Sequence, residues 1–340
     1  MVKDTCFIIA ELSANHGGSL DIAKETVRAA KRAGADAIKL QTYTADTITL
    51  DVKTDYFKIS QGTAWDGQYL YDLYKNASLP WEWHKPLYDV AKEVGLVCFS
   101  SPFDNTAVDF LEELNTPIYK VASFEITDIP LIQYIASKQK PMIISTGIAT
   151  VEDIELAIGA CKAVGNNNIT ILKCTSAYPA APEDANLLTI PDISKRFGVR
   201  SGLSDHTMGI EAPMVAVALG ATVIEKHFIL DKKIGGADAH FSLDENEFKQ
   251  MVDAVRLTES LIGKVDYDMT PKKIRSREFS RSLFVTQDVK KGDVITQENI
   301  RSVRPGYGLH PKYYNEILGK KFIADTERGE PLSLNIIESL

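Results

Sequence analysis

The alternation of short apolar segments with amphipathic helical segments is the feature that most constrains the fold of this chain. Eight predicted strands are mostly apolar and cover residues 7–12, 37–42, 97–100, 118–121, 142–145, 169–174, 200–203 and 223–227. Helical patterns lie between them, clearest at residues 20–33, 83–94, 106–114, 129–138, 151–163 and 210–219. Because helices separate the strands, the strands have to be parallel. Eight such units in about 260 residues predict an α/β protein with a (β/α)8 TIM barrel, and no GxGxxG follows the first strand to favour an open dinucleotide-binding sheet.

Composition and charge exclude several other classes of protein. The chain has 340 residues, 44% hydrophobic and 25% charged, which is typical of a globular protein with a large core. Its net charge of −8 argues against a nucleic-acid partner, because phosphate binding needs a basic excess. No apolar run reaches the roughly 18 residues that span a bilayer, and residues 1–4 lack signal-peptide features, so we expect a cytoplasmic protein with no membrane partner. The four cysteines form no CxxC pair, which predicts reduced core thiols.

The pattern of the chain changes after Gly263. Residues 264–281 are charged and polar, and from Ser282 the sequence consists of short strand-like runs and turns. We therefore predict a barrel domain at 1–265, a solvated linker at 266–281 and a small β-rich domain at 282–340. A core of about 60 residues is marginal alone, so this small domain is expected to pack on another surface.

Every predicted strand ends in a polar residue. The carboxyl ends of barrel strands meet at one rim, where barrel active sites lie. In chain order this rim would carry Glu11, Lys39, Gln41, Ser101, Lys120, Ser123, Ser145, Ser176, Tyr178, Ser204, His206 and His227. Because all eight strands end in polar side chains that can bind or react with a substrate, we predict one functional site at this rim.

The residue types at this rim indicate its chemistry. Lysines and hydroxyls suit a phosphorylated, carboxylated anion. His206 and His227 end adjacent strands, so their imidazoles could share one divalent cation, Mn or Mg. Glu11 could act as an acid or base or could hold a hydroxyl. The alternative is structural, since a single histidine or lysine at a strand end is more often a hydrogen-bonding or ion-pairing residue.

Other polar residues are expected outside the site. Lys173 and Lys226 are predicted to point outward or into the barrel floor, and Glu225 to face away from His227. His84 is expected on the surface or in a loop. Residues 45–80, rich in Tyr and Trp, form a predicted insertion whose aromatic rings are more easily explained by packing than by sugar stacking.

Several motifs resemble the sialic acid synthase family over nearly the whole chain. They are IAELSANHGGSL at 9–20, GADAIKLQT at 34–42, STG at 145–147, CTSAYP at 174–179, GLSDHT at 202–207 and EKHF at 225–228. The tail from Ser282, including Arg304-Pro305-Gly306, resembles that family's antifreeze-like (SAF, β-clip) domain. The segments STGIAT, LKCTSAYP and FSLD are most similar to those of the branch of this family that uses a 2,4-diacetamido-2,4,6-trideoxy hexose.

The resemblance implies an enzyme that condenses phosphoenolpyruvate with an N-acylated amino hexose to give a nine-carbon 2-keto acid and phosphate. It implies phosphoenolpyruvate ligands at Lys39, Ser101, Lys120, Ser123, Ser145, Ser176, Ser204 and His206. It implies a divalent metal (Mn or Mg, with Co possible) at His206 and His227, and sugar contacts at Glu11, Tyr178, His227 and Asp238. Arg304 would come from the other subunit of a domain-swapped homodimer.

Two positions depart from the family pattern, and other functions stay open. Ser176 stands where N-acetylneuraminate synthases usually have Asn, and Ser101 where some members have Thr. The chain could instead make N-acetylneuraminate or legionaminate from another hexosamine. It could also be a Schiff-base aldolase with Lys120 or Lys173 as nucleophile. A non-catalytic sugar- or ice-binding protein is the alternative from a different class.

Overall fold

The computed structural model describes residues 5–60, 62 and 65–339. Residues 1–4, on which the expectation about a signal peptide rests, and residues 61, 63 and 64 of the predicted insertion lie outside that part of the chain. The protein divides into two compact units, Met1–Gly263 and Lys264–Leu340, and each is described by itself.

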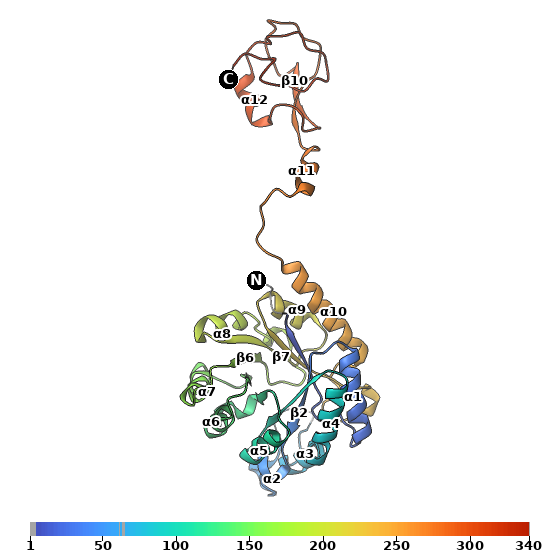
Figure 1. The fold of residues 1–340 in the computed structure, drawn as a ribbon, viewed down its shortest axis with the longest axis vertical. Coiled ribbons are helices and arrows are strands. Elements are labelled where there is room, and N and C mark those ends of the chain that lie inside the picture. Colours follow the sequence, from blue (N-terminus) through green and yellow to red (C-terminus); the bar gives the residue numbers. More distant parts are fainter. Residues whose placement is uncertain (1–4, 61, 63–64, 340) are drawn as a thin grey trace. The chain divides into compact units, whose positions relative to one another are not determined.

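The first unit is a closed barrel of eight parallel strands in chain order, as predicted (Figure 1). The strands are β1 (Phe7–Glu11), β2 (Ala37–Thr42), β3 (Val97–Pro102), β4 (Tyr119–Val121), β5 (Met142–Ser145), β6 (Ile169–Cys174), β7 (Arg200–Asp205) and β8 (Val223–His227). All eight lie within two residues of their predicted bounds. The ladder closes where β1 pairs with β8, from Phe7 opposite Val223 to Glu11 opposite His227.

Helices surround the barrel (Figure 1). They are α1 (Leu20–Arg32), α2 (Ala45–Ile48), α3 (Leu70–Ala77), α4 (Trp81–Glu93), α5 (Asn105–Glu113), α6 (Ile129–Ser137), α7 (Val151–Ala163), α8 (Thr189–Phe197), α9 (Glu211–Ala218) and α10 (Glu245–Ile262). The sequence patterns did not predict α8 and α10. In α10 only five of eighteen side chains are buried, so its apolar stripe is narrow.

Strand periodicity divides the barrel interior into an apolar floor and a polar upper layer. Successive side chains of a strand point to opposite faces, so every second residue enters the barrel. The floor consists of Ile9, Ala37, Phe99, Ile143, Leu172 and Val223. Two residues further along the same strands come Glu11, Lys39, Ser101, Ser145, Cys174 and Glu225, all of them buried. The sequence thus changes from apolar to polar at the same height on six strands.

Gly202 lets β7 enter the floor layer. A Cβ atom at this position would lie 2.3 Å from the carbonyl oxygen of Val223 and 2.8 Å from Leu172 Cδ2. Only a residue without a side chain fits between these neighbours, so glycine is required here by close approach of the strands.

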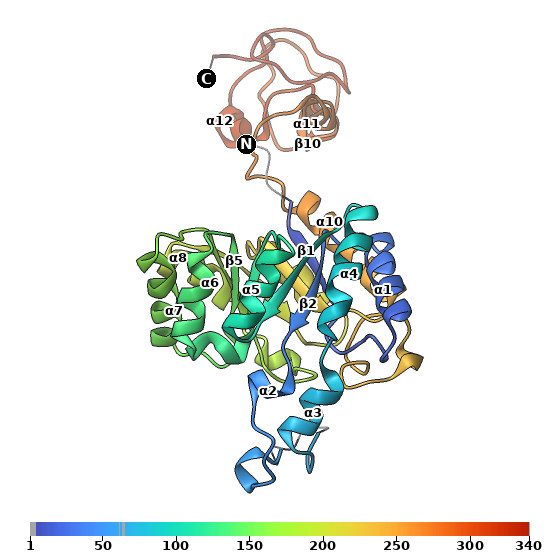
Figure 2. The ribbon, with the colours of Figure 1, turned by 60° about the horizontal axis from the view of Figure 1, so that its bottom comes forward.

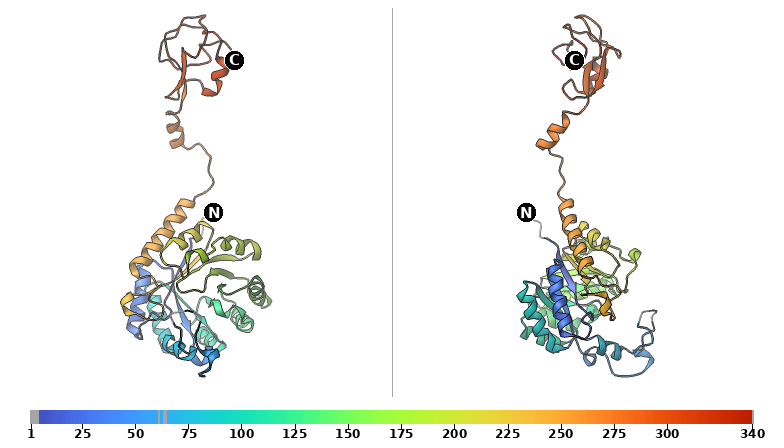
Figure 3. Two further views of the ribbon diagram at one scale, coloured as in Figure 1. Left: turned by 180° about the vertical axis from the view of Figure 1, so that it is seen from behind. Right: turned by 90° about the vertical axis from the view of Figure 1, so that its right-hand side faces the viewer.

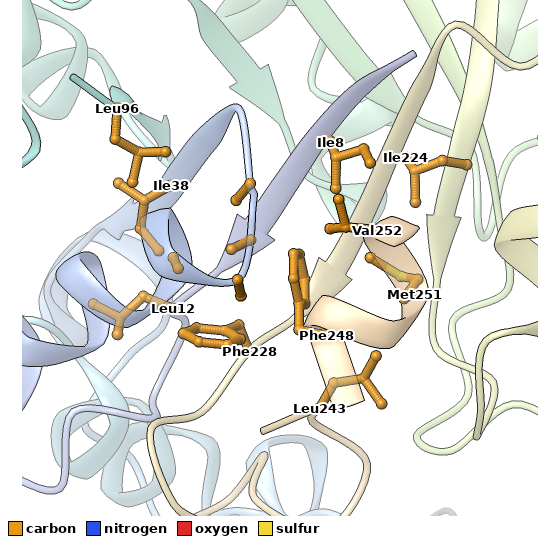
Figure 4. Close-up of a cluster of buried hydrophobic side chains, with 14 of the residues drawn as sticks. Ile8, Leu12, Ile38, Leu96, Ile224, Phe228, Leu243, Phe248, Met251 and Val252 are labelled. Carbon is orange, nitrogen blue, oxygen red and sulfur yellow. The ribbon is translucent and has the colours of Figure 1, made fainter. Parts of the chain in front are cut away.

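A second apolar layer lies between the strands and the helices (Figure 4). Ile8 and Ile224 point outward from adjacent strands and pack in one cluster with Phe248, Met251 and Val252 of α10. Full burial of such a side chain contributes roughly 1.5–3 kcal/mol. This layer fixes the helices, and with them the loops that carry the polar rim.

Residues 43–80 form a long insertion between β2 and α4. It contains α2, the 3-10 turn η1 (Asp55–Phe57) and α3, and it projects from the barrel body at the carboxyl end of β2 (Figures 2 and 3). Further 3-10 turns follow β4, β6 and β8, namely η2 (Ser123–Thr127), η3 (Pro182–Asp184) and η4 (Lys232–Ile234). All of these segments lie in strand-to-helix connections, the side on which barrel sites form.

The second unit is small and β-rich, as predicted. Strand β9 (Ser282–Val285) pairs antiparallel with β10 (Ile300–Val303), and further single bridges join the turns. Its core is a cluster of Leu283, Val285, Val289, Ile295, Ile300, Ile317, Phe322, Leu332 and Ile337. Three short elements complete the unit: α11 (Pro271–Arg277), η5 (Pro311–Tyr313) and α12 (Tyr314–Ile317). Within the described ranges of the chain, no helix is long and apolar enough to cross a membrane.

Candidate active site

Four buried charges of alternating sign form a row at the top of the barrel interior. Lys39 Nζ lies 2.8 Å from Glu11 Oε2 and 3.8 Å from Glu225 Oε1. The same Glu225 oxygen lies 3.5 Å from Lys120 Nζ. Isolated charges could not be buried at acceptable cost, but each charge in this row faces one of opposite sign. Glu11, Lys39, Glu225 and Lys120 are called the charge row below. In it, the ammonium groups of Lys39 and Lys120 lie on either side of the Glu225 carboxylate.

The expectation that Glu225 faces away from His227 is wrong. The two residues are two positions apart on β8, so strand periodicity places both side chains inside the barrel. Glu225 is buried in the charge row and accepts a hydrogen bond of 3.0 Å from Ser204 Oγ. The alternation of residues along β8 was sufficient to predict this position.

The two carboxyl groups of the charge row have different proton affinities. Burial raises the pKa of Glu11 to about 7, although attraction by Lys39 opposes this shift. Burial acts on Glu225 in the same direction, but Lys120 and Lys39 outweigh it and lower the pKa of Glu225. Glu225 is therefore a permanent counter-ion of the lysines, whereas Glu11 can exchange a proton near neutral pH.

The predicted hydroxyl groups gather around the charge row. Lys39 Nζ donates to Ser101 Oγ at 3.5 Å, and the Ser123 and Ser176 hydroxyls lie 2.8 Å apart. Ser145 Oγ is buried and has no hydrogen-bond partner in the described part of the chain. Because an unpaired buried hydroxyl is costly, Ser145 is poised to bind a ligand that supplies the missing partner.

Gly147 allows the loop after β5 to lie close to the Ser123 and Ser176 hydroxyls. A Cβ atom there would lie 2.0 Å from Ser176 Oγ and 2.5 Å from Ser123 Oγ. The backbone of the STG segment thus occupies the space beside the paired serines, and this space admits no side chain.

His206 and His227 lie side by side at the ends of β7 and β8, with ring centroids 5.3 Å apart. His206 Nδ1 donates to the Thr175 carbonyl at 2.9 Å, so its Nε2 keeps a free lone pair. Burial lowers the pKa of His227 well below its usual value, and His227 Nδ1 is buried without a hydrogen-bond partner among the residues that the structure describes. Although burial opposes it, hydrogen bonding with Cys174 and Thr175 raises the pKa of His206, so a divalent cation beside the neutral His227 would take the place of the Nε2 proton of His206.

The protein supplies few further metal ligands. Across residues 5–60, 62 and 65–339, no group of three or more His, Cys, Asp or Glu side chains could hold a metal ion. Asp238 Oδ2 comes closest, 3.7 Å from His227 Nδ1. The remaining ligands would therefore be water or substrate oxygens, a pattern typical of catalytic sites.

A cavity of about 500 Å³ lies next to these residues. Its polar wall includes the predicted site residues Gln41, Ser123, Ser176, Tyr178, His227 and Asp238. Gln41 Nε2 donates to Glu11 Oε1 at 2.9 Å and thereby connects the cavity to the charge row. The Tyr178 ring lies 4.5 Å from that of His206. The apolar lining of the cavity includes Ile48, Ile59, Leu70, Leu73, Phe103 and Phe124.

Glu125 is a site residue that the predicted set omitted. It lies in η2, two residues after Ser123, and lines the cavity. Burial raises its pKa to about 7, and Glu125 Oε2 has no hydrogen-bond partner among the described residues. Its position just after a strand end was the available signal.

His84 is not a surface or loop residue: it is buried in α4, where its Nε2 lies 2.8 Å from Thr42 Oγ1. It occupies the core-facing stripe of an amphipathic helix, which explains its burial. Lys226 does leave the barrel interior, as expected, while Lys173 is half-buried and donates to the Cys174 carbonyl. All four cysteines are free and buried.

Arg304 belongs to the second unit. It lines a separate cavity of about 610 Å³ with Thr270, Lys272, Lys273, Ser276, Arg277, Phe279 and Ser280. Residues 266–281, predicted as a linker, contain α11 and are almost entirely exposed.

The fold and the rim together define a barrel enzyme whose site concentrates cationic and hydroxyl groups beside two histidines. The NeuB family matches residues 26–267, and the SAF domain matches residues 280–338. This chain belongs to the NeuB family. Enzymes of this family condense phosphoenolpyruvate with a sugar, a carbon–carbon bond-forming transfer, and they are generally metal-dependent. The predicted family, enzyme class and two-domain fold are thereby confirmed.

Similar proteins come from several organisms. The pseudaminic acid synthase of Campylobacter jejuni (serotype O:23/36) is 51% identical over 96% of this chain and 95% of its own length. The pseudaminic acid synthase of Helicobacter pylori is 50% identical over 97% of both chains. Among solved structures, the spore coat polysaccharide biosynthesis protein spsE of Bacillus subtilis is 34% identical, with a TM-score of 0.66 over 99% of this chain and 97% of that chain.

Proposed function

We propose that this protein is a pseudaminic acid synthase, which condenses phosphoenolpyruvate with 2,4-diacetamido-2,4,6-trideoxy-altrose and water to give pseudaminic acid and phosphate. The charge row is the observation that carries the proposal, because it holds two ammonium groups ready for a multiply charged anion beside a cavity of about 500 Å³. The similarity to pseudaminic acid synthases of two organisms supports the choice of branch.

Phosphoenolpyruvate would bind at the charge row and its surrounding hydroxyls. Lys39 and Lys120 supply the positive charge, and Glu225 holds both ammonium groups in place until the substrate arrives. The unpaired Ser145 hydroxyl and the Ser123–Ser176 pair supply directional donors for phosphate or carboxylate oxygens. Ser101, Ser204 and His206 complete the proposed set of phosphoenolpyruvate ligands.

His206 and His227 would hold the divalent cation, Mn or Mg. When bound, such an ion acts as a Lewis acid on the sugar carbonyl and fixes its orientation. The hydrogen bond from His206 Nδ1 to the Thr175 carbonyl keeps the correct tautomer, and the low pKa of His227 keeps that ring neutral.

The bond changes of the condensation balance with one water molecule. C3 of phosphoenolpyruvate forms a bond to the aldehyde carbon of the open-chain sugar, and the aldehyde oxygen becomes a hydroxyl by taking a proton. Water adds to C2 and gives up one proton, which balances the proton taken by the aldehyde oxygen. Cleavage of the C2–O bond then releases phosphate, and the C2 hydroxyl loses its proton to the departing phosphate and becomes the ketone. Glu11, with a pKa of about 7, can exchange a proton in this sequence, and Gln41 fixes its carboxylate.

The acceptor sugar would occupy the cavity. Tyr178, His227 and Asp238 belong to its polar lining, and the insertion contributes the apolar residues Ile48, Ile59, Leu70 and Leu73. A 6-deoxy sugar with two acetamido groups presents several methyl groups, and these suit an apolar wall better than the hydroxymethyl group of N-acetylmannosamine does.

Arg304 would reach the sugar from the partner in a domain-swapped homodimer, where it would contact an acyl group. The resemblance of the small domain to the antifreeze-like module supports this assignment, and it gives the exposed segment 266–281 a role as a crossing linker. A cytoplasmic location of the enzyme is part of the same proposal.

Phosphate release from phosphoenolpyruvate and Mn(II) tests the proposal directly. The enzyme is offered 2,4-diacetamido-2,4,6-trideoxy-altrose, N-acetylmannosamine or a legionaminate precursor in separate reactions. We expect release with the trideoxy-altrose alone. Release with N-acetylmannosamine or the legionaminate precursor instead would move the protein to another branch, and no release with any acceptor would refute the synthase function.

A further inference from the structure

A buried ion pair lies behind the two histidines, on the outward face of β7 and β8. Lys226 Nζ lies 2.5 Å from Asp205 Oδ2 and donates a second hydrogen bond of 2.6 Å to the Thr207 carbonyl. The other carboxylate oxygen, Asp205 Oδ1, accepts from both Thr207 N and Thr207 Oγ1, at 2.9 Å and 2.8 Å. All three residues are at least 95% buried. None of them lines the cavity or belongs to the predicted site.

This ion pair lies where the ladder between β7 and β8 ends, although a bridge of Thr207 with Ala180 still joins the following residues on the β6 side. The pairing of β7 with β8 ends at Asp205 opposite Lys226. His206 follows directly after β7 and therefore lies beyond the last paired residue, while His227 is the last residue of β8. The Lys226 ammonium bonds to the residue before His206 and to the residue after it.

We propose that Asp205 and Lys226 are positioning residues that fix the spacing of His206 and His227 for one divalent cation. The proposal rests on the proposed function, since the cation is the one those histidines would hold. His206 directly follows Asp205, and His227 directly follows Lys226. The ion pair therefore sets the distance between the two backbone segments that carry the histidines. Because successive side chains of a strand alternate, the histidine side chains point into the barrel while the ion pair lies on the outer face. Groups that orient metal ligands from behind typically change metal affinity 10- to 100-fold when they are lost.

The proposal also explains why a buried ion pair is kept here. A buried ion pair is a weak source of stability, because desolvation offsets the attraction, but it demands one geometry. Lys226 satisfies two acceptors that belong to one turn, and Asp205 three donors. An apolar pair of equal volume would fill the space without fixing the turn that carries His206.

The test uses the double substitution Asp205→Asn with Lys226→Met in the full-length protein. It removes both charges together, so no uncompensated charge stays buried, and Asn can still accept from Thr207. Two quantities are measured in folded protein: Mn(II) affinity, from the free Mn(II) signal in electron paramagnetic resonance, and hydrogen exchange of residues 203–210 without metal. We expect Mn(II) affinity to fall about 10-fold or more and exchange of this segment to accelerate.

Asp36→Asn is the matched control. Asp36 joins β1 and α10 at the opposite end of the barrel, where it accepts from Ile8 N at 2.8 Å and from Arg256 at 2.9 Å. Its loss should lower the melting temperature and leave Mn(II) affinity within about twofold of the native value, because it is remote from the histidines. Asp205→Asn alone is the milder variant if the double variant does not fold, and it should weaken Mn(II) binding severalfold.

The outcomes separate the two proposals. Native Mn(II) affinity in the folded double variant or in folded Asp205→Asn, or unchanged exchange of residues 203–210, would overturn the positioning role. An equal loss of affinity in Asp36→Asn would show a general effect of stability and would also overturn it. Native protein that binds no Mn(II), with or without phosphoenolpyruvate, would instead refute the metal site of the proposed function, and that failure appears without any substitution.

Discussion

At the scale of single residues, the site depends on what surrounds each charge. Glu11 and Glu225 have the same side chain and the same depth in the barrel, yet the pKa of Glu11 is raised to about 7 and that of Glu225 is lowered. The difference arises because Glu225 contacts two lysines and a serine hydroxyl, whereas Glu11 contacts a single lysine. One carboxyl group can thus carry a proton while the other neutralises the anion-binding lysines.

Glu11→Gln should change how stability depends on pH. The folded-state pKa of Glu11 is raised from 4.5 to about 7, so its stabilising contribution is complete below pH 4.5 and disappears as pH rises through 7. The native protein should therefore lose up to about 3 kcal/mol between pH 4.5 and 8 that the variant does not lose. Urea unfolding of both proteins across this range measures the difference. Parallel curves would contradict the raised pKa.

Gly147→Ala should impair phosphoenolpyruvate binding. The added methyl group would clash with the Ser123 and Ser176 hydroxyls, so one of them must move. We expect the KM for phosphoenolpyruvate to rise about tenfold or more, with a lower melting temperature. Gly159→Ala is the control, because a Cβ atom at this position in α7 meets no atom within 4 Å. The control should keep its KM and become slightly more stable.

At the scale of elements, the insertion between β2 and α4 lines the cavity that is proposed to hold the acceptor sugar. Its helix α3 supplies Leu70, Leu73 and Tyr74 to the wall. None of the side chains of α3 is fully buried, so this helix contributes little to the barrel core. Its apolar residues Leu70 and Leu73 line the cavity, where the proposed acceptor sugar would contact them.

Leu73→Asn should therefore weaken the use of the acceptor sugar. A polar side chain in the apolar wall should lower kcat/KM for the trideoxy acceptor about tenfold, because a methyl group loses its apolar contact. The KM for phosphoenolpyruvate should not change. Leu50→Asn is the matched control, since Leu50 belongs to the same insertion, is 61% exposed and does not line the cavity. Equal losses in both variants would remove the argument for a sugar-facing wall.

At the scale of the whole molecule, the proposed function requires two domains for a complete site. The barrel unit contains the charge row and the histidines, and the second unit contains Arg304 in a basic surface cavity. In the proposed domain-swapped dimer, each site would combine the barrel of one subunit with Arg304 of the other.

Complementation between an impaired variant and an inactive one tests this exchange. Arg304→Ala should weaken sugar use more than phosphoenolpyruvate binding, and His206→Ala should abolish activity. A mixture refolded from equal amounts should regain about one quarter of native activity, because half of the dimers are mixed and each has one intact site. A mixture no more active than Arg304→Ala alone would show that Arg304 does not act across subunits.

Much of this molecule follows from the sequence alone, because its patterns are local. Alternation of apolar and helical segments predicted all eight strands, since period and parallel topology need no distant contact. The rim residues followed from strand ends for the same reason. The motif resemblance added the family and the small C-terminal domain.

Tertiary structure decided which polar groups meet. Strand periodicity places Glu225 inside the barrel, but only the closed sheet brings it between Lys39 and Lys120, which belong to β2 and β4. Burial of His84 and the Asp205–Lys226 pair likewise depends on which surfaces pack together. The physical reason is that the energy of a charge depends on its neighbours through space, whereas strand and helix formation depend mainly on neighbours along the chain.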